Sequence, residues 1–186
     1  MKTISRLLLT AALVGGTFAA PAAELSGVKM PDTLTLGDKA TKLNGMGLRK
    51  KSIFKVYVGG LYVEAPSKDA AAIVAADAPK AIKMHFLRSI DKAKLNEGFK
   101  EGFEANAKDK MAAEKAGIDK FLGFTADVKD GDEWLFAYVP GKGTTVSHGD
   151  KEQGLIEGKG FADALFMVWL GPKPPSDDLK KGMLGN

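Results

Sequence analysis

The segment that most constrains the fold of this chain spans residues 43–64 and reads LNGMGLRKKSIFKVYVGGLYVE. A Gly-x-Gly-x-Arg element (Gly45, Gly47 and Arg49) stands there just before a stretch, 53–63, that is rich in β-branched and aromatic residues. Both alternating faces of that stretch are largely apolar, which predicts a central strand covered by helices on one side and by ligand or further protein on the other. Glycine permits close backbone approach, and an arginine at the strand start directs a permanent cation toward whatever the sheet covers.

Hydrophobic periodicity and turn residues divide the rest of the chain into short strands and helices. Strands are expected at 81–88, 133–139, 144–148 and 155–156, with two more around a Gly-Asp turn within 32–43. Helices are expected at 67–76 with Ser67 as the cap, from Asp91 to 111, at 114–122, at 161–170 and at 177–183. Strands and helices grouped in blocks favour an α+β fold over a wound parallel sheet.

The helix expected after Asp91 carries an apolar stripe with two glycines beside it. The stripe residues fall four apart, which is helical spacing: Leu95, Phe99, Phe103, Ala107 and Met111. Glycine costs about 1 kcal/mol relative to alanine inside a helix, so Gly98 and Gly102 predict that something comes close to this face. Tight packing against the sheet is the plainer interpretation, and space left for a ligand is the alternative.

The N-terminus has the features of a secretory signal peptide. Lys2 and Arg6 precede an apolar run at 7–20, and small residues then offer an Ala-x-Ala cleavage site. The run is shorter than the roughly 20 apolar residues that a spanning helix needs, so we expect cleavage and not a retained membrane anchor. The predicted organisation is a signal peptide at 1–22 and a single domain at 23–186, in an exported, soluble protein that is periplasmic in a Gram-negative cell.

Composition argues against several classes of function. Removing the signal peptide takes Lys and Arg from 27 to 25 against 23 Asp and Glu, which gives no reason to expect nucleic-acid binding. The chain has no cysteine, so thiol redox chemistry and thiolate metal sites are absent. Its two histidines lack metal-ligand spacing; we expect His85 to be a half-buried strand residue and His148 a turn residue. No cofactor or metal is expected, because no P-loop, complete dinucleotide fingerprint or nucleophile motif is present.

Three blocks, taken in their order and spacing, resemble the chalcone isomerase-like family, specifically its bacterial exported branch. The blocks are 43–64, 81–106 and 154–185, and the resemblance covers nearly all of the chain after about residue 25. It implies an open-faced β-sandwich, in which a large antiparallel sheet is layered with helices. Family members include plant isomerases that close a chalcone ring, fatty-acid-binding proteins and bacterial proteins of unsettled function.

The resemblance places Arg49 at a ligand cleft, facing a carboxylate in the fatty-acid binders and an oxyanion in the isomerases. A buried guanidinium needs a partner, and an anionic head group supplies charge and paired hydrogen bonds. From spacing alone, it is equally plausible that Arg49 pairs with an internal acid such as Glu64 or is exposed at the strand start. Tyr57 and Tyr62 point to opposite strand faces, so only one reaches that cleft. The resemblance favours Tyr57, where the isomerases carry a catalytic threonine; an ordinary core tyrosine is the alternative.

Two positions on the helix after Asp91 depart from the isomerase pattern. Leu95 stands where plant isomerases carry a tyrosine and Gly102 where they carry an asparagine, unless a one-turn shift brings Asn96, Phe99 or Asn106 near instead. Without those polar groups we expect ring-closing catalysis to be weak or absent, whereas an arginine above an apolar pocket remains a binding site. The residues expected to contact a ligand are Arg49, Tyr57, Tyr62, Leu95, Phe99 and Gly102.

The remaining aromatic and cationic residues have plainer interpretations. Trp134, Phe136 and Tyr138 share one strand face and are expected in the core. Arg88 is expected to form a second cationic contact or to pair with Asp91. The basic cluster that Lys50 and Lys51 form beside Arg49 is expected to be a solvated strand edge.

Three functional hypotheses follow. The first is an exported binding protein for an amphipathic carboxylate such as a fatty acid, its tail between the sheet and the helix 91–111, with Arg49 on the carboxylate and Tyr57 assisting. The second is an isomerase, an intramolecular lyase of the chalcone isomerase type, in which Arg49 stabilises an oxyanion and Tyr57 orients substrate or water. The third is a non-catalytic envelope interaction module. The sequence leaves the oligomeric state open, and the expected partner is a small amphipathic ligand, either fatty acid or flavonoid-like.

Overall fold

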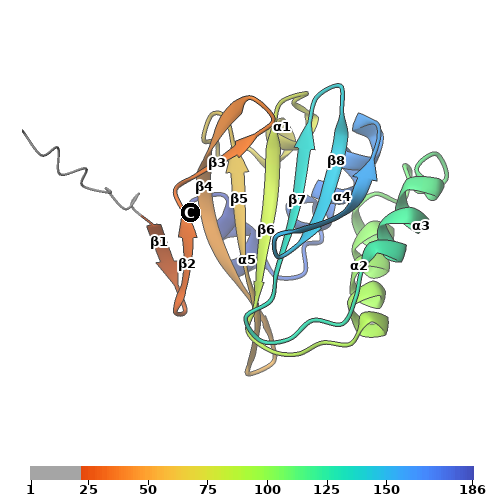
Figure 1. Ribbon diagram of the computed structural model, residues 1–186. Coiled ribbons are helices and arrows are strands. Elements are labelled where there is room, and N and C mark those ends of the chain that lie inside the picture. The colour runs from red at the N-terminus through yellow and green to blue at the C-terminus, as the bar shows by residue number, and fades with distance from the viewer. Residues whose placement is uncertain (1–21) are drawn as a thin grey trace, which may run out of the picture.

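The computed structural model describes residues 22–186, so the predicted signal peptide lies outside the described residues except for Ala22. Seven strands form one antiparallel sheet in chain order, beside a separate ribbon of β1 and β2 (Figure 1). The strands are β1 (Ala22–Leu25), β2 (Val28–Pro31), β3 (Thr33–Leu36), β4 (Lys39–Lys51), β5 (Phe54–Val63), β6 (Lys80–Phe86), β7 (Glu133–Val139), β8 (Gly143–His148) and β9 (Lys151–Ile156). The helices are α1 (Ala70–Ala75), α2 (Lys92–Asn106), α3 (Lys115–Phe124), α4 (Lys159–Leu170) and α5 (Asp177–Met183). The predicted α+β class, with a large antiparallel sheet layered with helices, is confirmed.

The Gly-x-Gly-x-Arg element precedes β5 as predicted, but it lies within a strand of its own, β4, which extends beyond the predicted limit at residue 43. The 13 residues of β4 include the whole element, and most of them pair with β5. The two glycines lie in direct contact with α5. A Cβ atom on Gly47 would lie 2.7 Å from the Cα of Leu179, and one on Gly45 would lie 2.8 Å from the backbone nitrogen of Gly185. Glycine stands at these positions because the backbone of the C-terminal helix occupies the space of a side chain.

Both faces of β5 are covered from Val56 to Val63, whereas Phe54 and Lys55 at its start are exposed, contrary to the prediction for 53–63. On one face α5 lies against β4 and β5, and the other long helices pack on the same side of the sheet (Figure 1). On the opposite face the β1–β2 ribbon brings the Met30 sulfur over Gly60, and the Tyr62 hydroxyl donates to the Pro31 carbonyl at 2.9 Å. The prediction of a strand with further protein on its second face is therefore confirmed.

The helix ends are set partly by side-chain caps. Asp91 caps α2 as predicted, but α1 is capped by Asp69, so the assignment of Ser67 was wrong. Helix α2 ends at Asn106, and the last positions of the predicted stripe, up to Met111, lie beyond it. None of the helices within residues 22–186 has the length and apolar composition to cross a bilayer.

The main core lies between the helices and the sheet. The predicted aromatic face of β7 is confirmed, since Trp134, Phe136 and Tyr138 are each at most 2% exposed. Helix α4 supplies the opposing layer, including Phe161 and Trp169, and is buried as its apolar sequence predicted. The core therefore places α4 and the segment that follows it directly above the strands that carry the predicted site.

Candidate functional site

Arg49 and Tyr57 lie directly opposite each other on β4 and β5, which places their side chains on the same face of the sheet. Arg49 is half-buried, and one terminal nitrogen of its guanidinium donates to the Pro175 carbonyl at 2.7 Å. No ion pair within residues 22–186 involves Arg49, so the alternative of a pair with Glu64 is not realised there. The guanidinium thus has a neutral backbone partner and further donors in its fork.

Tyr57 is buried, and its hydroxyl accepts a hydrogen bond from Trp169 Nε1 at 3.0 Å. Its ring lies 5.8 Å from that of Phe86, centre to centre. Burial raises the pKa of Tyr57 to about 12, although the charge of Arg49 and the bond from Trp169 oppose the shift. The phenol is therefore neutral at physiological pH, and its hydroxyl hydrogen is a donor beside the guanidinium.

The segment 171–176, between α4 and α5, closes the site over Arg49. Asn106 holds this segment twice, because its Nδ2 donates to the Lys173 carbonyl at 2.8 Å and its Oδ1 accepts from the Lys173 amide at 2.7 Å. Lys180 Nζ donates to the Gly171 carbonyl at 2.8 Å. The sequence interpretation did not anticipate this closing segment; the only signal was its run of prolines, which marks a turn but not its location.

The residues expected on α2 are buried in the aromatic core. The Phe99 ring centre lies 4.8 Å from that of Phe121 and 5.9 Å from that of Trp169, and Leu95 is 8% exposed. Phe99 thus joins the Arg49–Tyr57 group through Trp169, the hydrogen-bond donor to Tyr57. The region between sheet and α2 is filled by interlocking rings.

The two helix glycines have different surroundings. A Cβ on Gly102 would lie 2.6 Å from a methyl group of Val168, so the close approach predicted there is to α4 and not to the sheet. Gly98 is exposed and has no neighbouring atom within 4 Å of an added Cβ. Tyr62, also expected at the site, lies on the other face of the sheet beneath the β1–β2 ribbon. The fold therefore separates Gly98 and Tyr62 from Arg49.

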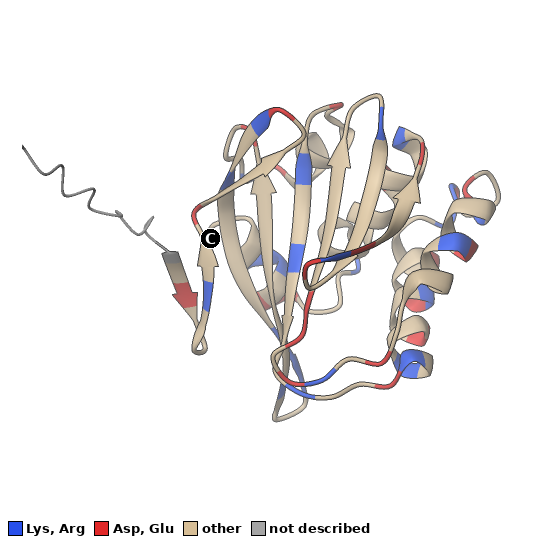
Figure 2. Ribbon diagram, viewed as in Figure 1, with Lys and Arg blue, Asp and Glu red and all other residues tan. Residues whose placement is uncertain are grey.

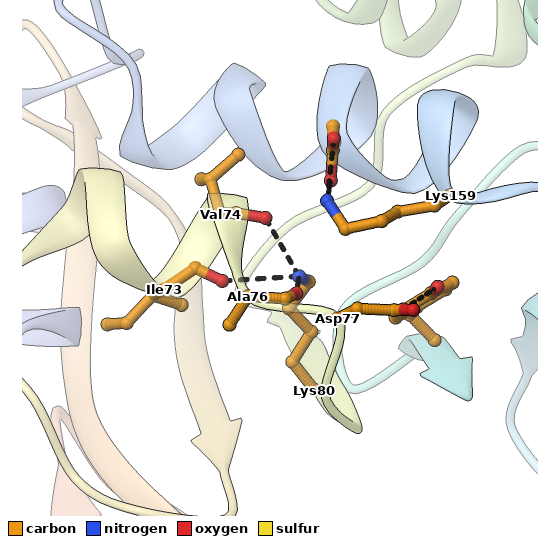
Figure 3. A network of polar contacts seen from close by, with 8 residues as sticks. Ile73, Val74, Ala76, Asp77, Lys80 and Lys159 are labelled. Carbon is orange, nitrogen blue, oxygen red and sulfur yellow. Dashed lines mark hydrogen bonds and ion pairs between the residues drawn. The ribbon is translucent and has the colours of Figure 1, made fainter. Parts of the chain in front are cut away.

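A second polar cluster surrounds Lys80, a residue that the sequence reasoning did not single out. Its Nζ donates to three carbonyls at the end of α1, those of Ile73, Val74 and Ala76, at 3.2, 2.9 and 2.6 Å (Figure 3). Burial lowers the pKa of Lys80 to about 8, partly offset by the carboxylate of Asp163. All three ammonium hydrogens are used, so Lys80 closes the C-terminus of α1 and has no donor left for a ligand.

A hollow of about 450 Å³ lies beside this cluster. Its walls include Asp77, whose carboxylate accepts from the Tyr138 hydroxyl at 2.5 Å, and the lysines Lys142 and Lys159. Lys159 in turn pairs with Asp163 at 2.7 Å. The hollow is thus lined by both acids and bases, and Lys159 is the lining residue that forms an ion pair within residues 22–186.

The two histidines contact neighbouring acids near the other end of β7. His85 Nδ1 lies 3.0 Å from Glu133, which also binds Lys83, so the prediction of a half-buried, satisfied strand histidine is confirmed. Burial disfavours the charged form of Glu133, but hydrogen bonds from Lys83 and His85 outweigh it and lower the pKa of Glu133. His148 is the last residue of β8, where a turn residue was predicted, and it contacts Asp132 at 3.3 Å. Among residues 22–186 no group of three His, Cys, Asp or Glu side chains is arranged to hold a metal ion.

The chain is similar to known proteins in sequence and in fold. Residues 22–185 match the sequence profile of a family described as chalcone isomerase-like. No curated protein sequence matches the chain. Among solved structures, it is similar to a fatty-acid binding protein of Arabidopsis thaliana, with 15% identity, a TM-score of 0.72 and coverage of 89% of this chain and 97% of that chain. At this identity the likeness shows the shared fold. The profile match over residues 22–185 shows that the chain belongs to the chalcone isomerase-like family.

Proposed function

We propose that this protein is an exported binding protein for an amphipathic carboxylate such as a fatty acid, with Arg49 on the carboxylate and Tyr57 assisting. One observation carries the proposal. A half-buried guanidinium without an acidic partner among residues 22–186 stands opposite a neutral, buried phenol on the neighbouring strand. The fold that the chain shares with a protein described as fatty-acid binding supports the same ligand class.

Ligand binding at Arg49 is proposed to proceed by exchange of partners. The Pro175 carbonyl now accepts from the guanidinium. A carboxylate forms charge-assisted, paired hydrogen bonds that are about twice as strong as bonds between neutral groups, so it competes well with a carbonyl. Because Pro175 belongs to the closing segment 171–176, its release frees one attachment of that segment, while Asn106 still holds Lys173.

The acyl tail is proposed to follow the aromatic region between α2 and the sheet. Phe99 and Trp169 there contact one another edge to face, with ring planes 75° apart, and Leu95 lies on the same helix as Phe99. Interiors of this density admit a ligand only where side chains or a helix shift. A slender, flexible chain demands a smaller shift than the two aryl rings of a chalcone, which favours a fatty acid over a chalcone.

The decisive experiment compares Arg49→Ala with Lys50→Ala, a matched control that removes the adjacent, exposed cation. Protein purified from cells is examined by native mass spectrometry and organic extraction, and a fatty acid is then titrated into the delipidated protein. Hydrogen bonds to a charged group contribute about 1.5–3 kcal/mol, so we expect Arg49→Ala to bind roughly 10- to 100-fold more weakly and Lys50→Ala to bind as wild type. Equal affinity in the two variants, with both folded, would remove Arg49 from the proposal. A wild-type protein that binds no carboxylate would remove the function itself.

The isomerase remains the alternative because the same Arg49–Tyr57 pair can stabilise an oxyanion. Leu95 and Gly102, which stand at the departing positions, are buried and bring no polar side chain to the site. We therefore expect the protein not to accelerate chalcone cyclisation over its spontaneous rate. The loss of chalcone absorbance measures that rate. An Arg49-dependent acceleration would establish the isomerase instead.

A further inference from the structure

The tip of the β4–β5 hairpin exposes two large apolar side chains. Ile53 is 87% exposed and Phe54 is 54% exposed, and they are the exposed large hydrophobic residues of the part of the chain that the structure describes. Lys51 pairs with Phe54, so Ser52 and Ile53 form a two-residue turn in which Ser52 has a φ of 54°. Such turns ordinarily hold Gly, Asn or Asp. Neither turn geometry nor packing explains an isoleucine there.

Cations surround these two apolar residues. Lys50 and Lys55 are exposed and lie directly opposite each other across the strands, an arrangement that destabilises a hairpin unless an anion approaches. The guanidinium of Arg88 lies 4.7 Å from the ring centre of Phe54, and the expected pair with Asp91 is absent within residues 22–186, where Asp91 pairs with Lys94.

The charge of the tip is unbalanced within the hairpin itself. No Asp or Glu occurs between residues 43 and 63. Within residues 22–186 no ion pair involves any of the four tip cations, Lys50, Lys51, Lys55 and Arg88. The hairpin extends to the lower end of the molecule, where basic residues colour it blue (Figures 1 and 2). In the neighbouring loop 127–132, Asp127 accepts from the Lys92 amide and Asp132 contacts His148, and no acid of this loop forms an ion pair with a tip cation among residues 22–186.

We propose that this hairpin tip docks on an anionic phospholipid bilayer, with Ile53 and Phe54 inserted among the head groups and the four cations on lipid phosphates. Apolar insertion combined with basic residues is how peripheral proteins hold anionic membranes. A protein partner fits less well, because a stable interface buries about 800 Å² on each side around an apolar centre, whereas the tip exposes two large apolar side chains among four cations. This surface is a site beyond the proposed carboxylate site, although Arg49 directly precedes Lys50 of the tip.

The test uses the protein purified from cells in processed form, with its N-terminus established by mass spectrometry. Flotation is measured with phosphatidylcholine vesicles with and without phosphatidylglycerol. We expect binding only to the anionic vesicles, weakened by salt. A triple variant of the tip is expected to bind the anionic vesicles on the order of 100-fold more weakly. It combines Lys50→Gln, Lys51→Gln and Lys55→Gln. The charge-matched control combines Lys100→Gln, Lys108→Gln and Lys110→Gln, away from the tip, and is expected to bind as wild type.

A second readout reports insertion directly. The native tryptophans Trp134 and Trp169 are each 1% exposed, whereas Phe54 is 54% exposed. In the Phe54→Trp variant, the introduced tryptophan is therefore the one that faces solvent. Its emission is expected to shift to the blue with anionic vesicles and to be quenched by brominated lipid. Absence of binding to anionic vesicles would overturn the proposal, as would equal loss in the control triple variant. Tip-dependent self-association or capture of a protein, without vesicle binding, would also overturn it. Fatty-acid affinity in solution is measured on the same variants, so failure of one proposal is distinguishable from failure of the other.

Discussion

Replacing Gly47 by alanine tests the contact on which the architecture of the site depends. An added Cβ would lie 2.7 Å from both the Cα and the carbonyl carbon of Leu179, well inside van der Waals contact. The obstacle is main chain, so no side-chain rotation relieves it and α5 must move. Movement of α5 also displaces segment 171–176 and with it the Pro175 carbonyl that Arg49 binds.

The loss of stability expected in Gly47→Ala follows from the side chains that α5 buries. Overpacking of a core costs about 1–3 kcal/mol. Leu179 and Met183 of α5 are fully buried, and each is worth about 1.5–3 kcal/mol on full exposure, which sets an upper limit of about 6 kcal/mol if the helix undocks. We expect Gly47→Ala to lower the free energy of unfolding by about 3 kcal/mol, which corresponds to a fall in Tm of roughly 6–12 °C at this chain length.

Gly98→Ala is the matched control. Gly98 is an exposed position inside α2 where an added Cβ meets no atom within 4 Å. The same change there is expected to stabilise the protein by about 0.4–1 kcal/mol, because alanine favours the helix and restricts the unfolded chain. Urea unfolding followed by circular dichroism measures both variants. Equal effects of the two substitutions, or an unchanged Tm in Gly47→Ala, would refute the argument that α5 requires glycine at this point.

Three further perturbations address the site and its surroundings. Tyr57→Phe leaves the buried Trp169 indole without its acceptor and is expected to destabilise by about 1–3 kcal/mol, measured by urea unfolding, whereas a cost near zero would show that this bond is dispensable. Asn106→Ala removes both bonds to Lys173 and is expected to expose segment 171–176 to faster amide hydrogen exchange, with unchanged exchange as the contrary result. The pKa of Lys80 is about 8 in the folded state, below its unfolded value. Between pH 8 and 10 the unfolded state therefore binds more protons than the folded state. The free energy of unfolding is expected to rise with pH there, by up to about 1.4 kcal/mol per pH unit. Lys80→Met is expected to lack that rise in unfolding free energy, and parallel pH profiles would contradict the assignment.

Local sequence signals predicted most elements well. The β7–β8 hairpin follows from alternating side chains and turn residues. The cap at Asp91 and the boundaries of α5 follow from side chains that accept hydrogen bonds from the helix they begin. Local signals did not reach distant contacts. The close approach expected at Gly45 and Gly47 is confirmed, but its partner is a helix from the other end of the chain, which nearby residues do not indicate.

The candidate site also combines features that the sequence predicted with partners that only the tertiary structure shows. The alternation of β5 placed Tyr57 and Tyr62 on opposite faces, and the three sequence blocks identified the family and singled out Arg49. The structure then placed Arg49 on β4, beside β5. The partners of these residues came from elsewhere in the chain: Trp169 on α4 donates to Tyr57, and Pro175 beyond it accepts from Arg49. A hydrogen bond across more than a hundred residues leaves no periodic trace in sequence.

The sequence by itself determined the α+β class, most of the strands and helices, the family, and the basic character of Arg49, Lys50 and Lys51. Those properties depend on side-chain chemistry and on spacing along a local backbone. Tertiary structure alone decided that α5 lies on Gly45 and Gly47, that segment 171–176 closes over Arg49, and that Lys80 ends α1. These features arise when backbone groups remote in sequence are brought within bonding distance, and close packing of the core selects which of them meet.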